Sequence, residues 1–185
     1  DDIETPLTEA LGERLSHLAL AGTAIYFQHG NRDFALGKRY AERYNIELIP
    51  PFYRPKEYPE ALLMHGDELC IDDQRYQRYK RIIRNPFLLT LLRHLPKKYR
   101  LGLAEKIRAK SARQSERSII VDINEAYTEQ IFEQYRCEVI IHGHTHRPAR
   151  HQMRNGVRYV LSDWDQTGDY LQYRAGQLTR HQIKI

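Results

Sequence analysis

The chain has 185 residues, of which 41% are hydrophobic, and this is enough for one domain with a buried core. Its longest apolar run, residues 87–92, is far shorter than a bilayer-spanning helix, which excludes such a helix from these residues. The formal net charge is +5, yet residues 74–117 hold 14 Lys or Arg against 2 Asp or Glu, so a basic segment lies within an otherwise acidic body.

Apolar periodicity predicts helices and short buried strands in alternation. Thr5 and Pro6 are typical of a helix N-cap and first turn, and Gly22 is typical of the residue that follows a helix end. The expected helices cover 7–21, 38–44, 99–110, a segment from Asn85-Pro86 to Pro96, and a segment capped by Asp122 whose buried face is Ile123, Tyr127, Ile131 and Tyr135. The expected strands cover 23–28, 61–64, 138–141, 157–161, 170–173 and 178–183, with a turn at Ala175-Gly176 and a Pro-rich loop or irregular edge strand over 50–59.

Each of the first three buried strands runs into a Gly-containing loop that carries His, Asn or Asp. The loops cover residues 29–33 (H-G-N-R-D), 65–67 (H-G-D) and 142–146 (H-G-H-T-H). Because ligands of α/β folds bind at the carboxyl ends of strands, the three loops are expected to converge. The sequence therefore predicts an α/β fold with one site at these strand ends.

The side chains of these loops are typical of a transition-metal site. His144 and His146 follow one strand two residues apart, His65 follows another, and Asn31 can supply a neutral carbonyl oxygen. Imidazole ligands favour Mn, Fe, Zn or Ni over Mg or Ca, and two such ions can activate water against a phosphoryl group. Asp33 and Asp67 are expected to orient the ligands and loops. The predicted metal ligands are Asn31, His65, His144 and His146.

These motifs resemble those of a known family. G-N-R-D (30–33), M-H-G-D (64–67) and G-H-T-H (143–146) are similar to the last three metal motifs of calcineurin-like metallophosphoesterases. General members usually have His where this chain has Arg32, and Arg at this position resembles the UDP-2,3-diacylglucosamine pyrophosphohydrolase (diphosphatase) branch. The segments H-G-D-E-L-C-I-D-D, H-G-H-T-H-R-P-A and K-S-A-R-Q-S-E-R-S agree with that branch. The resemblance covers essentially all 185 residues and implies an α/β sandwich of two sheets flanked by helices, with a basic helical insertion over 74–120 above the active site.

The resemblance also implies two motifs that this sequence does not contain. Family members begin with a D-x-H strand and a G-D-x-x-E loop, which supply an Asp, a His and a bridging Asp to the metals. Asp1-Asp2 is similar to the end of the loop that follows the second motif. The expectation is therefore a single metallophosphoesterase domain over 1–185 that lacks its N-terminal portion, holds one of two Mn²⁺ sites incompletely and is inactive by itself.

Roles carry over from the family residue by residue. Asn31 and His65 are implied to bind one metal, and His146 to complete the other. His144 is implied to bind the first metal or to face the phosphate, which makes Asn31 and His144 the implied catalytic residues. The implied substrate-binding residues are Asn31, Arg32, Asp73, Ser111, Gln114, Arg117 and His144. An ordinary surface role is the alternative for those in the insertion.

The implied activity is hydrolysis of the pyrophosphate bond of UDP-2,3-diacylglucosamine to UMP and 2,3-diacylglucosamine 1-phosphate, in lipid A biosynthesis, with two Mn²⁺. A basic and apolar insertion suits peripheral docking on the anionic cytoplasmic face of the bacterial inner membrane. Two isolated cysteines favour a reduced cytoplasmic protein. No nucleic-acid partner is expected. An apolar stripe suits either cover for acyl chains or ordinary core, and it comprises Phe87, Leu88, Leu91, Leu92 and Leu95.

Two other functions stay open at this point. Another calcineurin-like phosphoesterase, acting on nucleotides, phosphoproteins or nucleic acid, would keep the metal loops, but Arg32 and the basic, apolar insertion argue against it. A non-catalytic basic module for nucleic acid or membranes would show salt-sensitive binding and no loss of function on mutation of His144. The basic segment taken alone also fits a solvated helical surface.

Overall fold

The computed structural model describes residues 5–31, 33, 36–115, 122–165 and 167–185. Its helices are α1 (Pro6–Leu20), α2 (Lys38–Arg43), α3 (Gln74–Ile83), α4 (Pro86–His94), α5 (Lys97–Ser115) and α6 (Glu125–Tyr135). Its strands are β1 (Tyr26–Gln28), β2 (Glu47–Ile49), β3 (Ala61–Leu63), β4 (Val139–His142), β5 (Ala149–Gln152), β6 (Val157–Val160), β7 (Thr167–Arg174) and β8 (Gln177–Lys184). The predicted α/β class is confirmed.

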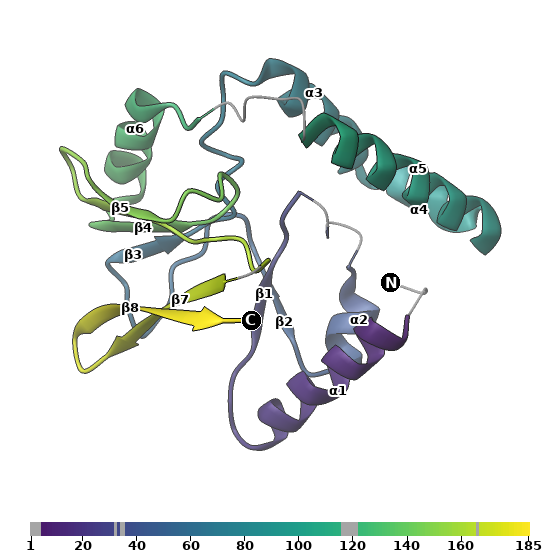
Figure 1. The fold of residues 1–185 in the computed structure, drawn as a ribbon, viewed down its shortest axis with the longest axis horizontal. Coiled ribbons are helices and arrows are strands. Elements are labelled where there is room, and N and C mark those ends of the chain that lie inside the picture. Colours follow the sequence, from purple (N-terminus) through teal and green to yellow (C-terminus); the bar gives the residue numbers. More distant parts are fainter. Residues whose placement is uncertain (1–4, 32, 34–35, 116–121, 166) are drawn as a thin grey trace.

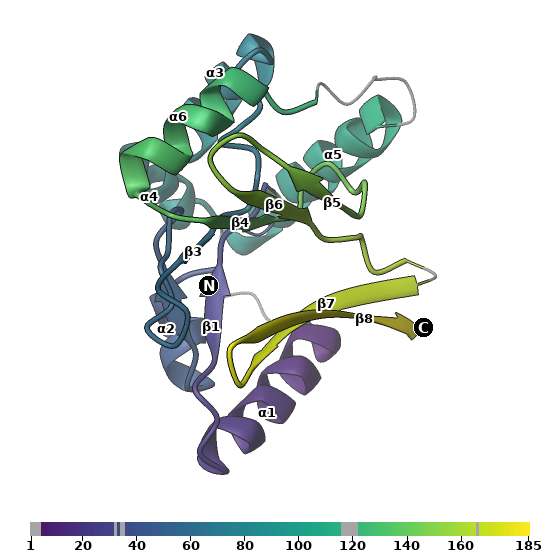
Figure 2. The same cartoon turned by 90° about the vertical axis from the view of Figure 1, so that its left-hand side faces the viewer.

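The strands form three sheets. The largest has the order β3-β4-β6-β5, in which β3, β4 and β6 run parallel and β5 is antiparallel to β6. A parallel pair, β1-β2, and an antiparallel hairpin, β7-β8, complete the set. Helix α6 lies on one side of the four-stranded sheet and the hairpin lies on the other (Figures 1 and 2). Helices α3, α4 and α5 extend away from the sheets as an arm (Figure 1).

The main core forms between the four-stranded sheet and α6. Leu62 on β3 and Ile140 on β4 are buried against Ile131 and Phe132 of α6. Burial of each such side chain stabilises the fold by about 1.5–3 kcal/mol. Parallel strands buried on both faces are continuous apolar runs, which explains why these two strands could be recognised in the sequence.

Helix α1 begins and ends where its sequence indicates. The hydroxyl of Thr5 accepts from the backbone N–H of Thr8, whose own hydroxyl accepts from the N–H of Thr5, and Pro6 occupies the first turn. The helix stops before Gly22, which has φ +96° and therefore lies in the left-handed region. A second core packs α1 and α2 around Tyr40 and Tyr44.

The predicted cap of α6 is wrong. Asn124 is the N-cap, and its side-chain oxygen accepts from the N–H of Tyr127 at 2.8 Å. Asp122 instead forms an exposed ion pair with Arg147, with 2.7 Å between Oδ2 and Nη1. Both residue types cap helices well, so residue type alone does not decide between Asp122 and Asn124.

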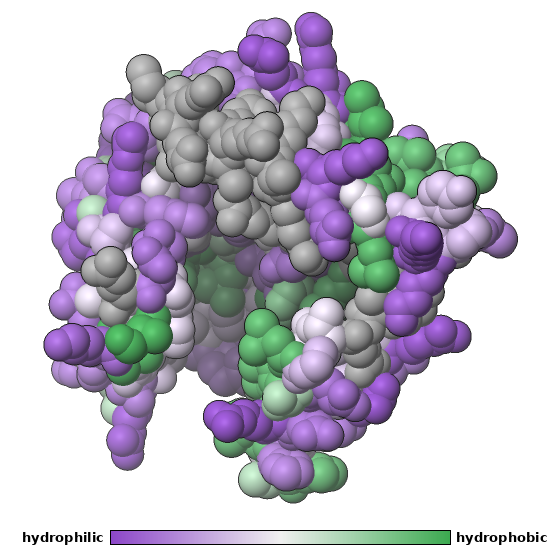
Figure 3. Space-filling view, turned by 45° about the vertical axis from the view of Figure 1, so that its right-hand side comes forward, coloured by the Kyte–Doolittle hydropathy of each residue, from purple (hydrophilic) through white to green (hydrophobic). Residues whose placement is uncertain are grey.

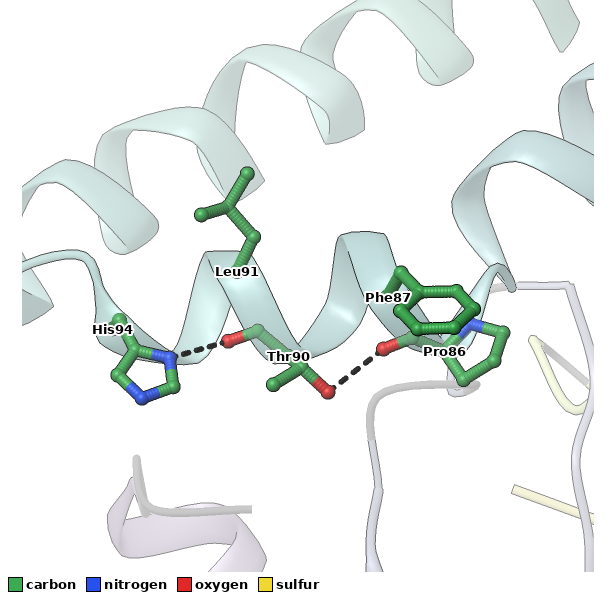
Figure 4. A pocket seen from close by; sticks show the side chains of 5 residues that line it. All are labelled: Pro86, Phe87, Thr90, Leu91 and His94. Carbon is green, nitrogen blue, oxygen red and sulfur yellow. Dashed lines mark hydrogen bonds between the residues drawn. The ribbon is translucent and has the colours of Figure 1, made fainter.

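The apolar stripe on α4 is largely exposed. Phe87 is 85% exposed and Leu91 is 65% exposed, so these two side chains are not ordinary core. They line a shallow pocket of about 490 Å³ together with Pro86, Thr90 and His94 (Figure 4). The hydroxyl of Thr90 donates to the carbonyl of Pro86, and Nδ1 of His94 donates to the carbonyl of Thr90. Within the described ranges, no helix is both long and apolar enough to cross a membrane.

Candidate functional site

The loops after β3 and β4 leave the same edge of the sheet, because the two strands are parallel neighbours. The N–H of Gly143 donates to the carbonyl of His65 at 3.0 Å, which joins the two loops. The rings of His65 and His144 then meet edge to face, with 5.1 Å between their centroids.

The loop after β1 reaches the same place. A Cβ on Gly30 would lie 2.9 Å from Cε1 of His65, so the backbone of this loop packs directly on the imidazole. Asp33 holds the loop closed, since its carboxylate accepts from the N–H of Gly30 at 2.5 Å. The predicted convergence of the three loops is confirmed for Gly30, His65 and His144. Asn31 follows Gly30 directly and is half-buried.

The two central imidazoles are held in their neutral form. Burial, followed by the charges of Arg84 and Lys80, lowers the pKa of His65 below its ordinary value. Burial and the neighbouring His65 lower the pKa of His144 to about 4. A neutral imidazole keeps a free lone pair, which is the form that binds a metal ion. The Nε2 atom of His65 is buried and lacks a hydrogen-bond partner in the described part of the chain.

His146, a further predicted metal ligand, is more exposed than His65 and His144. His146 is about half exposed, and its Nδ1 lies 3.4 Å from Oδ2 of Asp163. It has φ +53° and His144 has φ +64°, so both histidines hold the left-handed conformation that non-glycine residues seldom adopt. Among the residues that the structure describes, no group of three or more His, Cys, Asp or Glu is positioned to hold a metal.

Of the implied substrate-binding residues in the basic segment, Asp73 is the one whose side chain the structure describes. Asp73 is the N-cap of α3, where its Oδ1 accepts from the N–H of Tyr76 at 2.9 Å. Ser111 and Gln114 lie on α5, but their side chains lie outside the description, as do Arg32 and Arg117 entirely.

Asp67 connects α3 to the site. Its carboxylate is fully buried and accepts from the hydroxyl of Tyr76 at 2.6 Å. Its Oδ2 also lies 2.9 Å from Nζ of Lys80 and 3.5 Å from Arg84, and Arg84 donates to the carbonyl of Gly30 at 3.0 Å. The helix is thereby tied to two of the three loops. This agrees with the expectation that Asp67 orients loops.

The partners of Asp67 share one face of α3 and were not identified from the sequence. Tyr76, Lys80 and Arg84 are spaced four residues apart, which places them in a row along the helix. That spacing was available as a signal, but a row of basic residues is usually a solvated surface. The buried carboxylate of Asp67 is what shows that this row makes contacts inside the protein and is not a solvated surface.

The charge on Asp67 is strongly favoured. Burial opposes ionisation, but hydrogen bonds from Glu68 and Tyr76 and the ammonium of Lys80 hold the pKa of Asp67 well below its ordinary value. Burial and the charge of Asp67 raise the pKa of Glu68. The ammonium of Lys80 lies between the two carboxylates, 2.9 Å from Oδ2 of Asp67 and 2.8 Å from Oε1 of Glu68.

The buried ring of His142 contacts both the β3 loop and the β4 loop. Its Nδ1 donates to the carbonyl of Gly143 at 2.9 Å, and its Nε2 accepts from Nη1 of Arg158 at 3.0 Å. Burial lowers the pKa of His142 to about 4, consistent with a neutral ring that accepts from an arginine. A Cβ on Gly66 would lie 2.6 Å from Nδ1 of His142.

We expect Gly66→Ala to lower the free energy of unfolding by about 2–4 kcal/mol. The residue has φ +113°, which costs an L-residue about 1–2 kcal/mol, and the new methyl group would also press on His142. Urea unfolding measures the loss. Gly22→Ala is the matched control, since Gly22 has φ +96° but no atom within 4 Å of the added Cβ. Equal losses in the two variants would show that the contact with His142 contributes nothing.

Comparison with known proteins finds several relatives that all carry the same name. No protein-family model matches the chain. The UDP-2,3-diacylglucosamine hydrolase of Actinobacillus succinogenes is 42% identical over 176 residues, which are 93% of this chain and 75% of that protein. The proteins of the same name from Pasteurella multocida and Pseudomonas fluorescens are 41% and 40% identical, over 97% and 93% of this chain and 77% and 72% of their own lengths.

Proposed function

Because the chain belongs to the UDP-2,3-diacylglucosamine hydrolase family, we propose that it hydrolyses UDP-2,3-diacylglucosamine in lipid A biosynthesis. The bond broken is the pyrophosphate, and the products are UMP and 2,3-diacylglucosamine 1-phosphate. The observation that carries the proposal is the meeting of His65, His144 and the backbone of Gly30 at the ends of three strands. A two-sheet metallophosphoesterase sandwich is the architecture proposed with it.

The cofactor proposed for this site is a pair of Mn²⁺ ions, held in part by Asn31, His65, His144 and His146. The residues fit such a group, because His65 has a buried Nε2 without a hydrogen-bond partner in the described ranges, beside a second neutral imidazole. Two bound ions would activate water and offset the charge that develops on the phosphoryl oxygens. Imidazole ligands favour Mn over Mg.

The chain's own residues would position the site and the substrate. Asp33 and Asp67 fix the loops, and the fork-shaped guanidinium of Arg32 suits two phosphoryl oxygens. The basic segment would hold the rest of the substrate through Asp73, Ser111, Gln114 and Arg117. Asp73 uses Oδ1 to cap α3, so its Oδ2 is the oxygen proposed for the substrate.

The exposed apolar face of α4 supports a role in holding acyl chains and in docking on a membrane. Phe87 and Leu91 are the most exposed of the stripe, and they lie on an arm whose neighbouring helices are rich in Lys and Arg. The face in Figure 3 is hollowed, with hydrophobic residues inside the hollow and at its rim. Apolar anchors beside basic residues bind anionic interfaces. We therefore propose peripheral binding to the cytoplasmic face of the inner membrane.

The test is a substrate panel with the full-length protein. UDP-2,3-diacylglucosamine with Mn²⁺ is expected to yield UMP, whereas bis(p-nitrophenyl) phosphate, cyclic nucleotides and a phosphopeptide are expected to react far more slowly. A preference for one of those other substrates would contradict the proposal and favour a different phosphoesterase activity. Absence of any turnover would favour the non-catalytic alternative.

A further inference from the structure

A second pocket lies behind the G-H-T-H loop and contains a buried arginine. Its volume is about 230 Å³, and it is enclosed by the stretch that follows the loop and by strands β5 and β6. Arg158 on β6 is only 4% exposed, and its Nε lacks a hydrogen-bond partner in the described part of the chain. The residues that line the pocket are Asp122, Thr145, Arg147, Pro148, Ala149, His151, Arg158 and Val160.

The charge of Arg158 is poorly matched by its surroundings. Its one hydrogen bond recorded in the described residues is to the ring of His142, which supplies no carboxylate or other anionic group. Asp122 and Glu125 act on its guanidinium only through space, and Asp122 is already paired with Arg147. A buried guanidinium without a bonded carboxylate is costly by several kcal/mol.

The pocket itself carries a net positive charge. Arg147 and Arg158 are cationic and Asp122 is anionic. Burial and the charge of Arg158 lower the pKa of His151, which disfavours a positive charge on that ring. A planar guanidinium offers paired N–H donors that match the oxygens of a phosphate group.

We propose that this pocket binds a phosphate-class oxyanion, with Arg158 at its base and Arg147 at its mouth. The anion is either free phosphate or the phosphate group of a nucleotide. The anion would supply the negatively charged partner that the surroundings of Arg158 lack, and an acceptor for its Nε. Arg158 also donates to His142, whose ring contacts the β3 and β4 loops. Binding of an anion in the pocket is therefore connected to these two loops through His142.

The experiment measures phosphate binding by calorimetry with the full-length protein, after chelation of metal ions so that they do not attract the anion. Arg147→Ala is expected to weaken phosphate binding about tenfold through loss of a charged donor. Asp122→Asn is expected to strengthen it about threefold by removing the opposing charge. Both side chains are more than half exposed, so neither change threatens the fold.

Arg154→Ala is the matched control. Arg154 forms an exposed ion pair with Glu133 and does not line the pocket, so its loss is expected to leave phosphate affinity unchanged. The proposal is overturned if the wild-type protein does not bind phosphate, or if Arg147→Ala and Arg154→Ala have the same effect. If UMP competes with phosphate for the binding that Arg147→Ala weakens, the ligand is the phosphate group of a nucleotide. If UMP does not compete for that binding, the ligand is free phosphate.

Discussion

Replacing His144 by alanine is expected to lower kcat/KM of the full-length protein for UDP-2,3-diacylglucosamine by at least about a thousandfold. Its ring meets that of His65 at the point where the three loops converge, and burial keeps it neutral and able to bind a cation. Removal of one group that stabilises developing charge typically costs 10²–10³-fold, and loss of a metal ligand is expected to cost at least as much. Steady-state release of UMP measures the effect, and bound Mn²⁺ is expected to fall in parallel.

The control for this variant is His17→Ala, which removes an exposed histidine on α1, far along the chain from the three loops. We expect it to retain wild-type activity and metal content. If the His144 variant kept the activity of the His17 variant, hydrolysis would not depend on His144 and the proposed catalytic site would be wrong.

Replacing Asp67 by asparagine is expected to lower the free energy of unfolding by about 3–5 kcal/mol. The buried carboxylate accepts from Tyr76 and pairs with Lys80 and Arg84, so a neutral amide removes the central charge of a buried network in which Lys80 still has Glu68 at 2.8 Å. The change would also weaken the attachment of α3 to the β3 loop, which Gln77 still contacts through the backbone carbonyl of Asp67 at 2.8 Å. Urea or thermal unfolding at pH 7 measures the loss.

The same residue predicts a pH dependence. Its ordinary pKa is 3.8 and its folded pKa lies well below that value, so its stabilising effect is fully present above about pH 4. The effect is lost as the pH falls from there towards the folded pKa. We therefore expect the wild-type protein to lose stability between about pH 4 and pH 2 more steeply than the asparagine variant.

Asp122→Asn is the stability control for Asp67. Its ion pair with Arg147 is more than half exposed on both sides, and exposed pairs contribute about 0–1 kcal/mol. A loss of stability in the Asp67 variant no larger than in the Asp122 variant would show that the buried network does not anchor α3.

Local sequence signals predicted the strand-end loops and the ends of α1 well, whereas α5 (Lys97–Ser115) is longer than the expected 99–110 and α6 has a different cap. Thr5, Pro6 and Gly22 define α1 through contacts within a few residues, and the buried strands β3 and β4 are continuous apolar runs. In the site, the close approach of His65 and His144 follows from two parallel strands that end side by side. Such features depend on short-range geometry that the residue types themselves determine.

Features that depend on distant partners were not predicted. The edge strand β5 has a mixed sequence and is recognisable only by its pairing with β6. Asn124 caps α6 while Asp122 pairs with Arg147, and the exposure of Phe87 depends on which elements lie beside α4. Helical spacing alone does not distinguish a buried apolar stripe from an exposed one.

The attachment of α3 determines where the helical arm can bend. Lys80 and Arg84 attach the C-terminal half of α3 to a buried carboxylate and to the Gly30 loop, so this helix is held against the loops of the site. Asn85-Pro86 comes directly after the last of these attachments, where the chain leaves α3 and begins α4. A hinge that admits a bulky two-tailed lipid would therefore lie at this dipeptide, with α4 and α5 swinging as the moving part and α3 as its fixed base.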